Sequence, residues 1–210
     1  MTDEDEVGGF PLIGGWRDTG LPDPGGGAEY GAMIEALRDF LDKVAAARPD
    51  RATIEALGGD LAQWSRRLAP LAVPEREQIF AQRHDLPGRG QTMSPRLVIT
   101  EGDRDSVRGK VTFGRYFLGG GGAVHGGAIP LLFDEVLGRL ANSGGRPRAR
   151  TAYLNVDFRA ITPIEAELSV SGWYVREEGR KRLLRGELRH GETLCAEAEG
   201  LFVVLKPGQP

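Results

Sequence analysis

The sequence has 210 residues, of which 40% are hydrophobic and 27% charged, with a formal net charge of −3. This length and composition fit a globular protein with one domain and an appendage, or two small domains. The small negative charge gives no bulk attraction for nucleic acid and the apolar stretches are too short to cross a bilayer, so we expect no nucleic-acid partner and no membrane span.

The N-terminal segment, residues 1–27, is acidic and then rich in Gly and Pro, which predicts a flexible tail. It lacks the basic and apolar regions of a secretory signal, and the single cysteine, Cys195, has no partner for a disulfide. We therefore expect a cytoplasmic protein. One alternative stays open for the tail: four apolar residues form a short arm that docks on the fold, namely Phe10, Leu12, Ile13 and Trp16.

Residues 28–90 are predicted to form a helical extension and a linker. Two apolar stripes at helical spacing, from Tyr30 to Val44 and from Ile54 to Leu68, are followed by Pro49 and Pro70, which favours a hairpin of two helices. Gly58-Gly59 weakens the second helix, which leaves open a break at its middle. We expect residues 73–90 to run over the surface, since they combine prolines with many charges.

Residues 91–206 show the pattern of a separate α+β domain. Strand-like segments at 97–100 and 107–117 precede a run that is apolar almost all round, 128–142, which predicts an enclosed helix. Four more strand segments follow at 152–159, 168–175, 182–190 and 194–205, with short connections that favour antiparallel pairing. A curved antiparallel sheet wrapped around one central helix is the simplest way to bury that helix.

The start of the central helix is the most informative place in the chain. Four glycines, Gly119 to Gly122, precede His125-Gly126-Gly127, which leads directly into the helix. The first N–H groups of a helix have no partner within it and lie at its electropositive end, so glycines there let a ligand oxygen approach these donors. Two guests fit such donors: the oxyanion of an acyl-transfer reaction, or a phosphate.

Two acidic residues, Asp134 and Glu135, lie about two turns further along the helix. They project roughly 100° apart, so we expect one of them at most to face a site. For Glu135 an ion pair with Arg139, four residues on, is favoured. For Asp134 a structural and a catalytic role are equally open. The other chemical options are weaker, because the chain shows no metal-ligand spacing, no nucleophile elbow and no P-loop.

The segment AVHGGAIPLLFDEVLG resembles the PaaI-like branch of the hot-dog-fold thioesterases, in which an HGG turn begins the central helix and an acid follows the His at the same spacing. The resemblance extends over roughly residues 91–206, with TAYLNVDF at 151–158, Gly179-Arg180-Lys181 at a hairpin, and the closing CAEAEGLFVVL. It implies a hot-dog fold with an N-terminal helical extension.

The resemblance also implies a function and roles for residues. It implies hydrolysis of acyl-CoA to free acid and CoA, with no cofactor beyond the CoA of the substrate and no metal. The N–H of Gly126, with help from Gly127, would polarise the thioester carbonyl next to His125. Asp134 would act as base or nucleophile, and Thr151 would hold the attacking water.

The implied site lies in a homodimer interface, with Asp134 facing Gly126 of the partner and the dimers pairing into tetramers as an option. CoA phosphates would meet basic residues, namely Arg159, Arg180 and Lys181.

One position departs from the family pattern. Many relatives have Asn six residues before the His, and here that position is Gly119. Losing one donor to an oxyanion costs about a hundredfold or more in rate. Two functions from different classes therefore stay open: a thioesterase for medium- to long-chain acyl-CoA, in which the helical hairpin caps the sheet or lines an acyl tunnel, and a non-catalytic acyl-CoA-binding or scaffold protein. A hot-dog hydratase is not favoured, since its Asp/His motif is missing.

Overall fold

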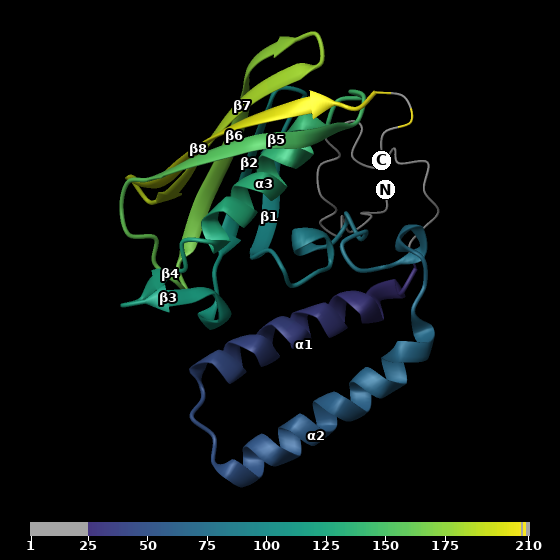
Figure 1. The fold of residues 1–210 in the computed structure, drawn as a ribbon. Helices are drawn as coiled ribbons and strands as arrows, with labels where there is room; N and C mark the ends of the chain where they lie inside the picture. The colour runs from purple at the N-terminus through teal and green to yellow at the C-terminus, as the bar shows by residue number, and fades with distance from the viewer. Residues whose placement is uncertain (1–24, 207, 209–210) are drawn as a thin grey trace, which may run out of the picture.

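The computed structural model describes residues 25–206 and residue 208. All but the last three residues of the predicted tail, and the whole of its apolar arm, lie outside the described residues. The described chain begins with a helical hairpin and continues as a six-stranded sheet that covers one helix (Figure 1). This arrangement confirms the expected fold class, a curved antiparallel sheet around a central helix with helices before it.

The main sheet is antiparallel throughout, in the order β1-β2-β6-β7-β8-β5. Its strands are β1 (Arg96–Gly102), β2 (Ser106–Thr112), β5 (Ala149–Phe158), β6 (Glu167–Glu178), β7 (Lys181–His190) and β8 (Thr193–Val204). Each overlaps a segment with a strand-like pattern, because side chains alternate between the two faces of a pleated sheet. In β2, for example, Val107 and Val111 are buried whereas Arg108 and Lys110 between them are exposed.

The glycine run before the central helix forms a small hairpin that the sequence pattern did not predict. β3 (Leu118–Gly120) pairs with β4 (Ala123–Val124), and Gly121 and Gly122 make the turn. Both turn glycines have a positive φ, 55° and 79°, which glycine adopts without the steric cost of a Cβ. The run therefore gives the backbone the tight turn that leads into the central helix.

The central helix, α3 (Ala128–Ala141), is buried on all sides but one. Nine of its 14 residues are buried, and its core side chains pack on apolar residues of the inner sheet face, among them Leu168, Val170, Leu184, Leu188 and Phe202. The exposed residues of α3 are Leu131 and Asp134. They are three residues apart and so share one side of the helix. Asp134 consequently lies on the open side of α3.

β5 forms one edge of the sheet and is exposed along most of its length. Leu154, Val156 and Phe158 alternate along the strand and so share one face, on which Leu154 and Val156 are half-buried and Phe158 is 56% exposed. An edge strand also presents a row of backbone N–H and C=O groups without a neighbouring strand. In the described chain, therefore, a ten-residue strand with apolar side chains is left open beside the open side of α3 (Figure 1).

The helical hairpin consists of α1 (Gly27–Ala46) and α2 (Arg51–Leu68), as the two apolar stripes predicted. α2 runs unbroken through Gly58-Gly59, which settles the open question of a break. α1 attaches the hairpin to the body of the fold: Ile34 is buried, the Tyr30 hydroxyl donates to Gly90 O at 3.1 Å, and Arg38 donates to Ser94 O at 3.2 Å. α2 lies on the far side of α1 from the sheet (Figure 1).

The segment between the hairpin and β1 is only partly the surface linker that we expected. Residues 72–78 are exposed, but Gly88, Gly90 and Gln91 are buried. The Gln91 side chain donates to Ser94 Oγ at 2.9 Å and accepts from Met93 N at 2.8 Å. The second half of the segment is therefore packed into the fold, because its turns place it under α1 rather than over the surface.

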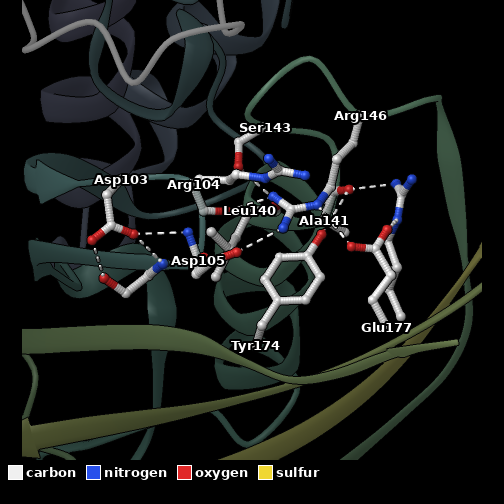
Figure 2. A network of polar contacts seen from close by, with 11 residues as sticks. Asp103, Arg104, Asp105, Leu140, Ala141, Ser143, Arg146, Tyr174 and Glu177 are labelled. Carbon is white, nitrogen blue, oxygen red and sulfur yellow. Dashed lines mark hydrogen bonds and ion pairs between the residues drawn. The ribbon is translucent and has the colours of Figure 1, made fainter.

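A partly buried polar network fixes the C-terminal end of α3 (Figure 2). The Ala141 carbonyl accepts from the Tyr174 hydroxyl at 3.2 Å and from Arg182 at 2.6 Å. The Arg182 side chain, 2% exposed, forms an ion pair with Glu177 at 2.8 Å, and Arg146 pairs with the same carboxylate at 3.1 Å. A cation at this end of a helix also interacts favourably with the helix dipole. The network thereby holds the helix that carries the candidate site.

Candidate active site

The HGG turn is held in place by backbone hydrogen bonds on both sides. His125 N donates to Phe117 O at 2.7 Å, and Val124 N donates to Thr162 O at 2.8 Å. The turn enters α3 through a bond from Ala128 N to His125 O at 2.9 Å. These bonds tie the turn to Phe117, just before β3, and to the loop that contains Thr162, so the N-terminus of α3 is presented in a defined orientation.

The two glycine N–H groups of this turn differ in their partners. Gly127 N donates to His125 Nδ1 at 3.0 Å. Within residues 25–206, nothing accepts from Gly126 N, and Gly126 is exposed. An imidazole that accepts at Nδ1 carries its proton on Nε2 in the neutral form. The turn therefore offers an outward backbone donor at Gly126, while Gly127 holds the His125 ring.

Gly119 has a steric reason to lack a side chain. A Cβ added there would lie 2.8 Å from His125 Cα and 3.1 Å from His125 N, because β3 runs close against the turn. Separations under about 3 Å force the backbone to shift. In this arrangement the backbone at position 119 therefore has no room for the Asn side chain found in many relatives. No side-chain donor stands at this position in its place.

Asp134 and Thr151 contact each other on the open side of α3. The Thr151 hydroxyl donates to Asp134 Oδ1 at 2.8 Å, and both residues are exposed. Thr151 is on β5, so the contact joins the edge strand to the central helix. A carboxylate fixed at one oxygen keeps the other oxygen available to accept a proton from water or to attack a carbonyl carbon.

The HGG turn and Asp134 are too far apart to act together within one chain. Gly126 and Asp134 are eight residues apart, which corresponds to about 12 Å along the helix axis. A thioester carbonyl bound at the Gly126 N–H has its carbon within about 4 Å of that donor, since a hydrogen bond spans about 3 Å. The structure thus brings Asp134 and Thr151 together, and His125, Gly126 and Gly127 together, as two half-sites on one helix.

The three basic residues suggested for CoA binding are divided between these two half-sites. Phe158 lies beside the HGG turn, 3.8 Å from the place of a Cβ at Gly126, so the next residue, Arg159, is at that end of β5. Arg180 Nε donates to Val204 O at 2.9 Å, and Val204 pairs with Ala149 at the other end of β5, near Thr151. Lys181 begins β7 next to Arg180. The ends of β5 are about 30 Å apart, so one chain does not gather these residues at one phosphate.

Arg159 is also engaged in ion pairs. Its guanidinium lies 2.5 Å from Glu197 Oε1 and 3.2 Å from Asp157 Oδ2. These two carboxylates raise the pKa of Arg159, with the Glu197 hydrogen bond as the larger cause. A phosphate at this residue would therefore compete with two acids.

A buried ion cluster behind the site was only half predicted. The expected pair exists, with Arg139 Nε 2.6 Å from Glu135 Oε1, and both side chains are nearly buried. Arg89, from the segment before β1, also pairs with Glu135 at 2.8 Å. Burial lowers the pKa of the neighbouring His84, and the charges of Arg139 and Arg89 lower it further. No local signal identifies Arg89, because it lies 46 positions before Glu135 and only the fold brings them together.

Two features that the described residues lack bear on other chemistries. No group of three or more His, Cys, Asp or Glu side chains in residues 25–206 is arranged to hold a metal ion. Within the same range, no helix has the length and hydropathy needed to cross a bilayer. Cys195 is fully buried, in agreement with a packing role. The cytoplasmic location stays a prediction.

Comparisons with known proteins agree with this geometry. Residues 121–197 match the model of the thioesterase superfamily. The chain is similar to acyl-coenzyme A thioesterase THEM4 from Bos taurus, 35% identical over 96 residues that make up 45% of this chain and 39% of that protein. The Mus musculus protein of the same name is 34% identical over 99 residues, 46% of this chain and 42% of that one. The chain thus spans about two fifths of the length of these curated relatives.

A solved structure described as a thioesterase superfamily protein covers more of the chain. It is 29% identical, with a TM-score of 0.72 over 87% of this chain and 94% of the other. The similarity therefore includes much of the helical extension as well as the sheet. The glycine turn, the central helix and most of the sheet all lie within the matched segment 121–197. Residues 121–197 thus match the model of the thioesterase superfamily, and the fold is that of a solved thioesterase superfamily protein.

Proposed function

We propose that this protein hydrolyses the thioester of an acyl-CoA to a free acid and CoA. The observation that carries the proposal is the pair of half-sites at the start and on the open side of α3: Gly126, which is exposed and whose N–H has no acceptor within residues 25–206, and the exposed Asp134 carboxylate bonded to Thr151. The curated relatives that carry the name acyl-coenzyme A thioesterase support the substrate class. A donor for the carbonyl oxygen and a carboxylate are what thioester hydrolysis needs.

The chemistry assigns one role to each half-site. The Gly126 N–H donates to the thioester oxygen and stabilises the negative charge that develops on it, with the positive end of the helix dipole behind it. As base, Asp134 takes a proton from water while the water oxygen bonds to the carbonyl carbon. The C–S bond then breaks and the CoA sulfur leaves as thiolate. As nucleophile, Asp134 itself bonds to that carbon, CoA leaves, and water cleaves the resulting anhydride. The Thr151 hydroxyl orients the carboxylate in both routes.

A second copy of the chain completes the site in this proposal. About 12 Å separates Gly126 from Asp134 along α3, so one chain cannot place both on one carbonyl. Two chains that pair their β5 edges around a twofold axis run their α3 helices in opposite directions, which sets Gly126 of one copy toward Asp134 of the other. The open β5 edge and the exposed apolar Phe158 support this interface.

The same pairing gathers the basic residues. Arg159 lies at the HGG end of β5, whereas Arg180 and Lys181 lie at the Thr151 end. In an antiparallel pair of copies these two ends come together, so the three cations flank one site. We propose that they bind the CoA phosphates, with Arg180 and Lys181 as the stronger contributors because Arg159 is already paired.

The acyl group is proposed to lie along the open apolar surface between copies and to be of medium to long chain. Leu131 on α3, Phe158 on β5 and Ile161 after it are 39%, 56% and 75% exposed in one copy. The cavity under the hairpin, about 230 Å³, is separate from this surface and has a mixed lining, with charged Glu35, Arg38, Asp39, Asp42 and Arg96 beside apolar Leu41, Tyr116 and Phe117.

The test is thiol release from acyl-CoAs of short, medium and long chain and with aromatic acyl groups. Wild type is compared with Asp134→Asn and, as a matched control, Asp39→Asn, which removes an exposed carboxylate of α1. We expect release that peaks at medium or long chains, falls at least a hundredfold in Asp134→Asn, and is unchanged in Asp39→Asn. If wild type binds acyl-CoA tightly but releases no thiol, the protein is an acyl-CoA-binding protein and not a hydrolase.

A further inference from the structure

α2 carries an apolar stripe that nothing in the described chain covers. Its apolar residues alternate at steps of three and four, in the sequence Ile54, Leu57, Leu61, Trp64, Leu68. This is the a/d spacing of a helix that packs against another helix along its length. Within residues 25–206, however, α2 buries none of its residues, and Leu61, Trp64 and Leu68 are 49%, 55% and 59% exposed.

The exposed apolar surface of the described chain is concentrated on this hairpin. Of its 18 exposed large hydrophobic residues, eight lie between residues 27 and 71, three of them on α1 and five on α2 or just after it. Single exposed apolar residues need no explanation, but a contiguous stripe of them on one helix marks an interaction surface. The glycines of α2 also indicate an interaction surface. Each costs about 1 kcal/mol relative to alanine inside a helix, yet a Cβ at Gly58 or Gly59 would meet nothing within 4 Å, so no contact within one copy requires a glycine there.

We propose that the occupant is the α2 helix of a second copy, paired antiparallel. In an antiparallel pair the a positions of one helix face the d positions of the other. Leu61 then packs against Trp64 of the second copy, and Leu57 packs against Leu68, with each contact made twice around the twofold axis. Two hairpins joined in this way supply the four helices of a bundle.

Charge supports a second copy in this register. The residues that flank the seam of the proposed pair face each other, and those on one side are Asp60 and Arg67. Asp60 of each copy meets Arg67 of the other, which gives two opposite-charge contacts. Within residues 25–206 Asp60 has no ion-pair partner, whereas Arg67 lies over the Trp64 ring at 4.1 Å, close to the seam. On the other side of the seam Gly58 faces Ser65, and these small residues let the helices approach closely.

Charge reversal tests the pairing without touching its apolar core. Sedimentation velocity at low salt compares wild type with Asp60→Arg, Arg67→Asp and the double variant, and Arg66→Asp serves as control. Arg66 is next to Arg67 but projects away from the seam. Each single reversal sets two like-charge contacts in place of two opposite-charge ones. We expect association about tenfold to a hundredfold weaker in either single variant, restored in the double variant, and unchanged in Arg66→Asp.

A cross-link tests the direction of the pairing. The natural Cys195 is buried, so new surface thiols report on contacts between copies. We expect a disulfide when a Gly58→Cys chain is mixed with a Ser65→Cys chain, and little in either chain alone, since only antiparallel helices bring these two positions together. Circular dichroism checks that each variant keeps its helices.

Two results would overturn the proposal. The first is a sedimentation velocity result in which Asp60→Arg and Arg67→Asp associate as strongly as wild type. The second is a disulfide between copies of the same single-cysteine variant, with none between the two different variants in the mixture. Loss of binding to lipid vesicles in Leu61→Lys, with an unchanged mass, would assign the stripe to a membrane surface instead. Thiol release is not needed for any of these results, so they stand apart from the proposed activity.

Discussion

The buried ion cluster behind the candidate site gives the sharpest prediction of stability. Glu135 lies between Arg89 and Arg139, at 2.8 Å and 2.6 Å, and its side chain is 7% exposed. Glu135→Gln keeps the shape of the side chain but leaves two guanidinium groups around an uncharged amide. Removing one partner of a buried ion pair costs about 3–5 kcal/mol. Because Arg89 is 29% exposed and water can solvate it, we expect about 3 kcal/mol.

The assay is thermal unfolding of Glu135→Gln beside Glu167→Gln. In a domain of this size 1 kcal/mol shifts Tm by about 2–4 °C, so we expect Glu135→Gln to lower Tm by about 6–12 °C. Glu167 makes the same kind of contact with Lys110 at 2.8 Å, but both side chains are more than half exposed, and such a pair contributes about 1 kcal/mol at most. Equal losses in the two variants would refute the reasoning, since they would mean that burial adds nothing to the value of this cluster.

Three further predictions concern the site and its surroundings. Thr151→Val should lower kcat for thiol release about tenfold or more with little change in KM, because it removes the hydroxyl that orients Asp134, and Thr151→Ser should keep most of the rate. Gly119→Asn, which restores the residue of many relatives, should lower the rate rather than raise it, because its Cβ collides with His125; faster release would show that the turn adapts. Burial and two neighbouring arginines lower the pKa of His84, so the folded state binds its proton less tightly, and stability should be lost as pH falls below about 6.5; His84→Gln should flatten that part of the stability curve measured in urea.

The parts of the fold that could be predicted are those with a local pattern. α3 is apolar almost all round because the sheet encloses it, and β2 alternates because one of its faces is wet. The pairing of β2 with β6 has no such signal, since it joins segments about 60 residues apart. The β3–β4 hairpin was missed for a different reason: its strands are short, and four of the seven residues in 118–124 are glycine, which has no side-chain period.

The candidate site divides in the same way. The contact of Thr151 with Asp134 agrees with the expectation that both belong to one site, and the HGG turn does begin the central helix. The grouping of Arg159 with Arg180 could not be judged from the sequence, because it depends on the register between β5 and β8, which sets them at opposite ends of β5. The exposure of Phe158 has no local signal either, because alternation separates the two faces of a strand and does not say what covers each face.

The two proposed interfaces lead together to a definite assembly. The β5 edge and the α2 stripe are separate surfaces, so each belongs to its own twofold axis. Two twofold axes that cross at right angles close into a tetramer, whereas axes that do not meet give an open chain of copies. A closed tetramer of this kind can be divided into dimers at either of its two interfaces. The two kinds of dimer are expected to differ in activity. Asp60→Arg should release dimers that still hydrolyse acyl-CoA, because their β5 interface and both half-sites are intact. Leu131→Lys, on the open side of α3, should release dimers that do not hydrolyse it. Equal activity in the two kinds of dimer would mean that the second copy contributes nothing to the site.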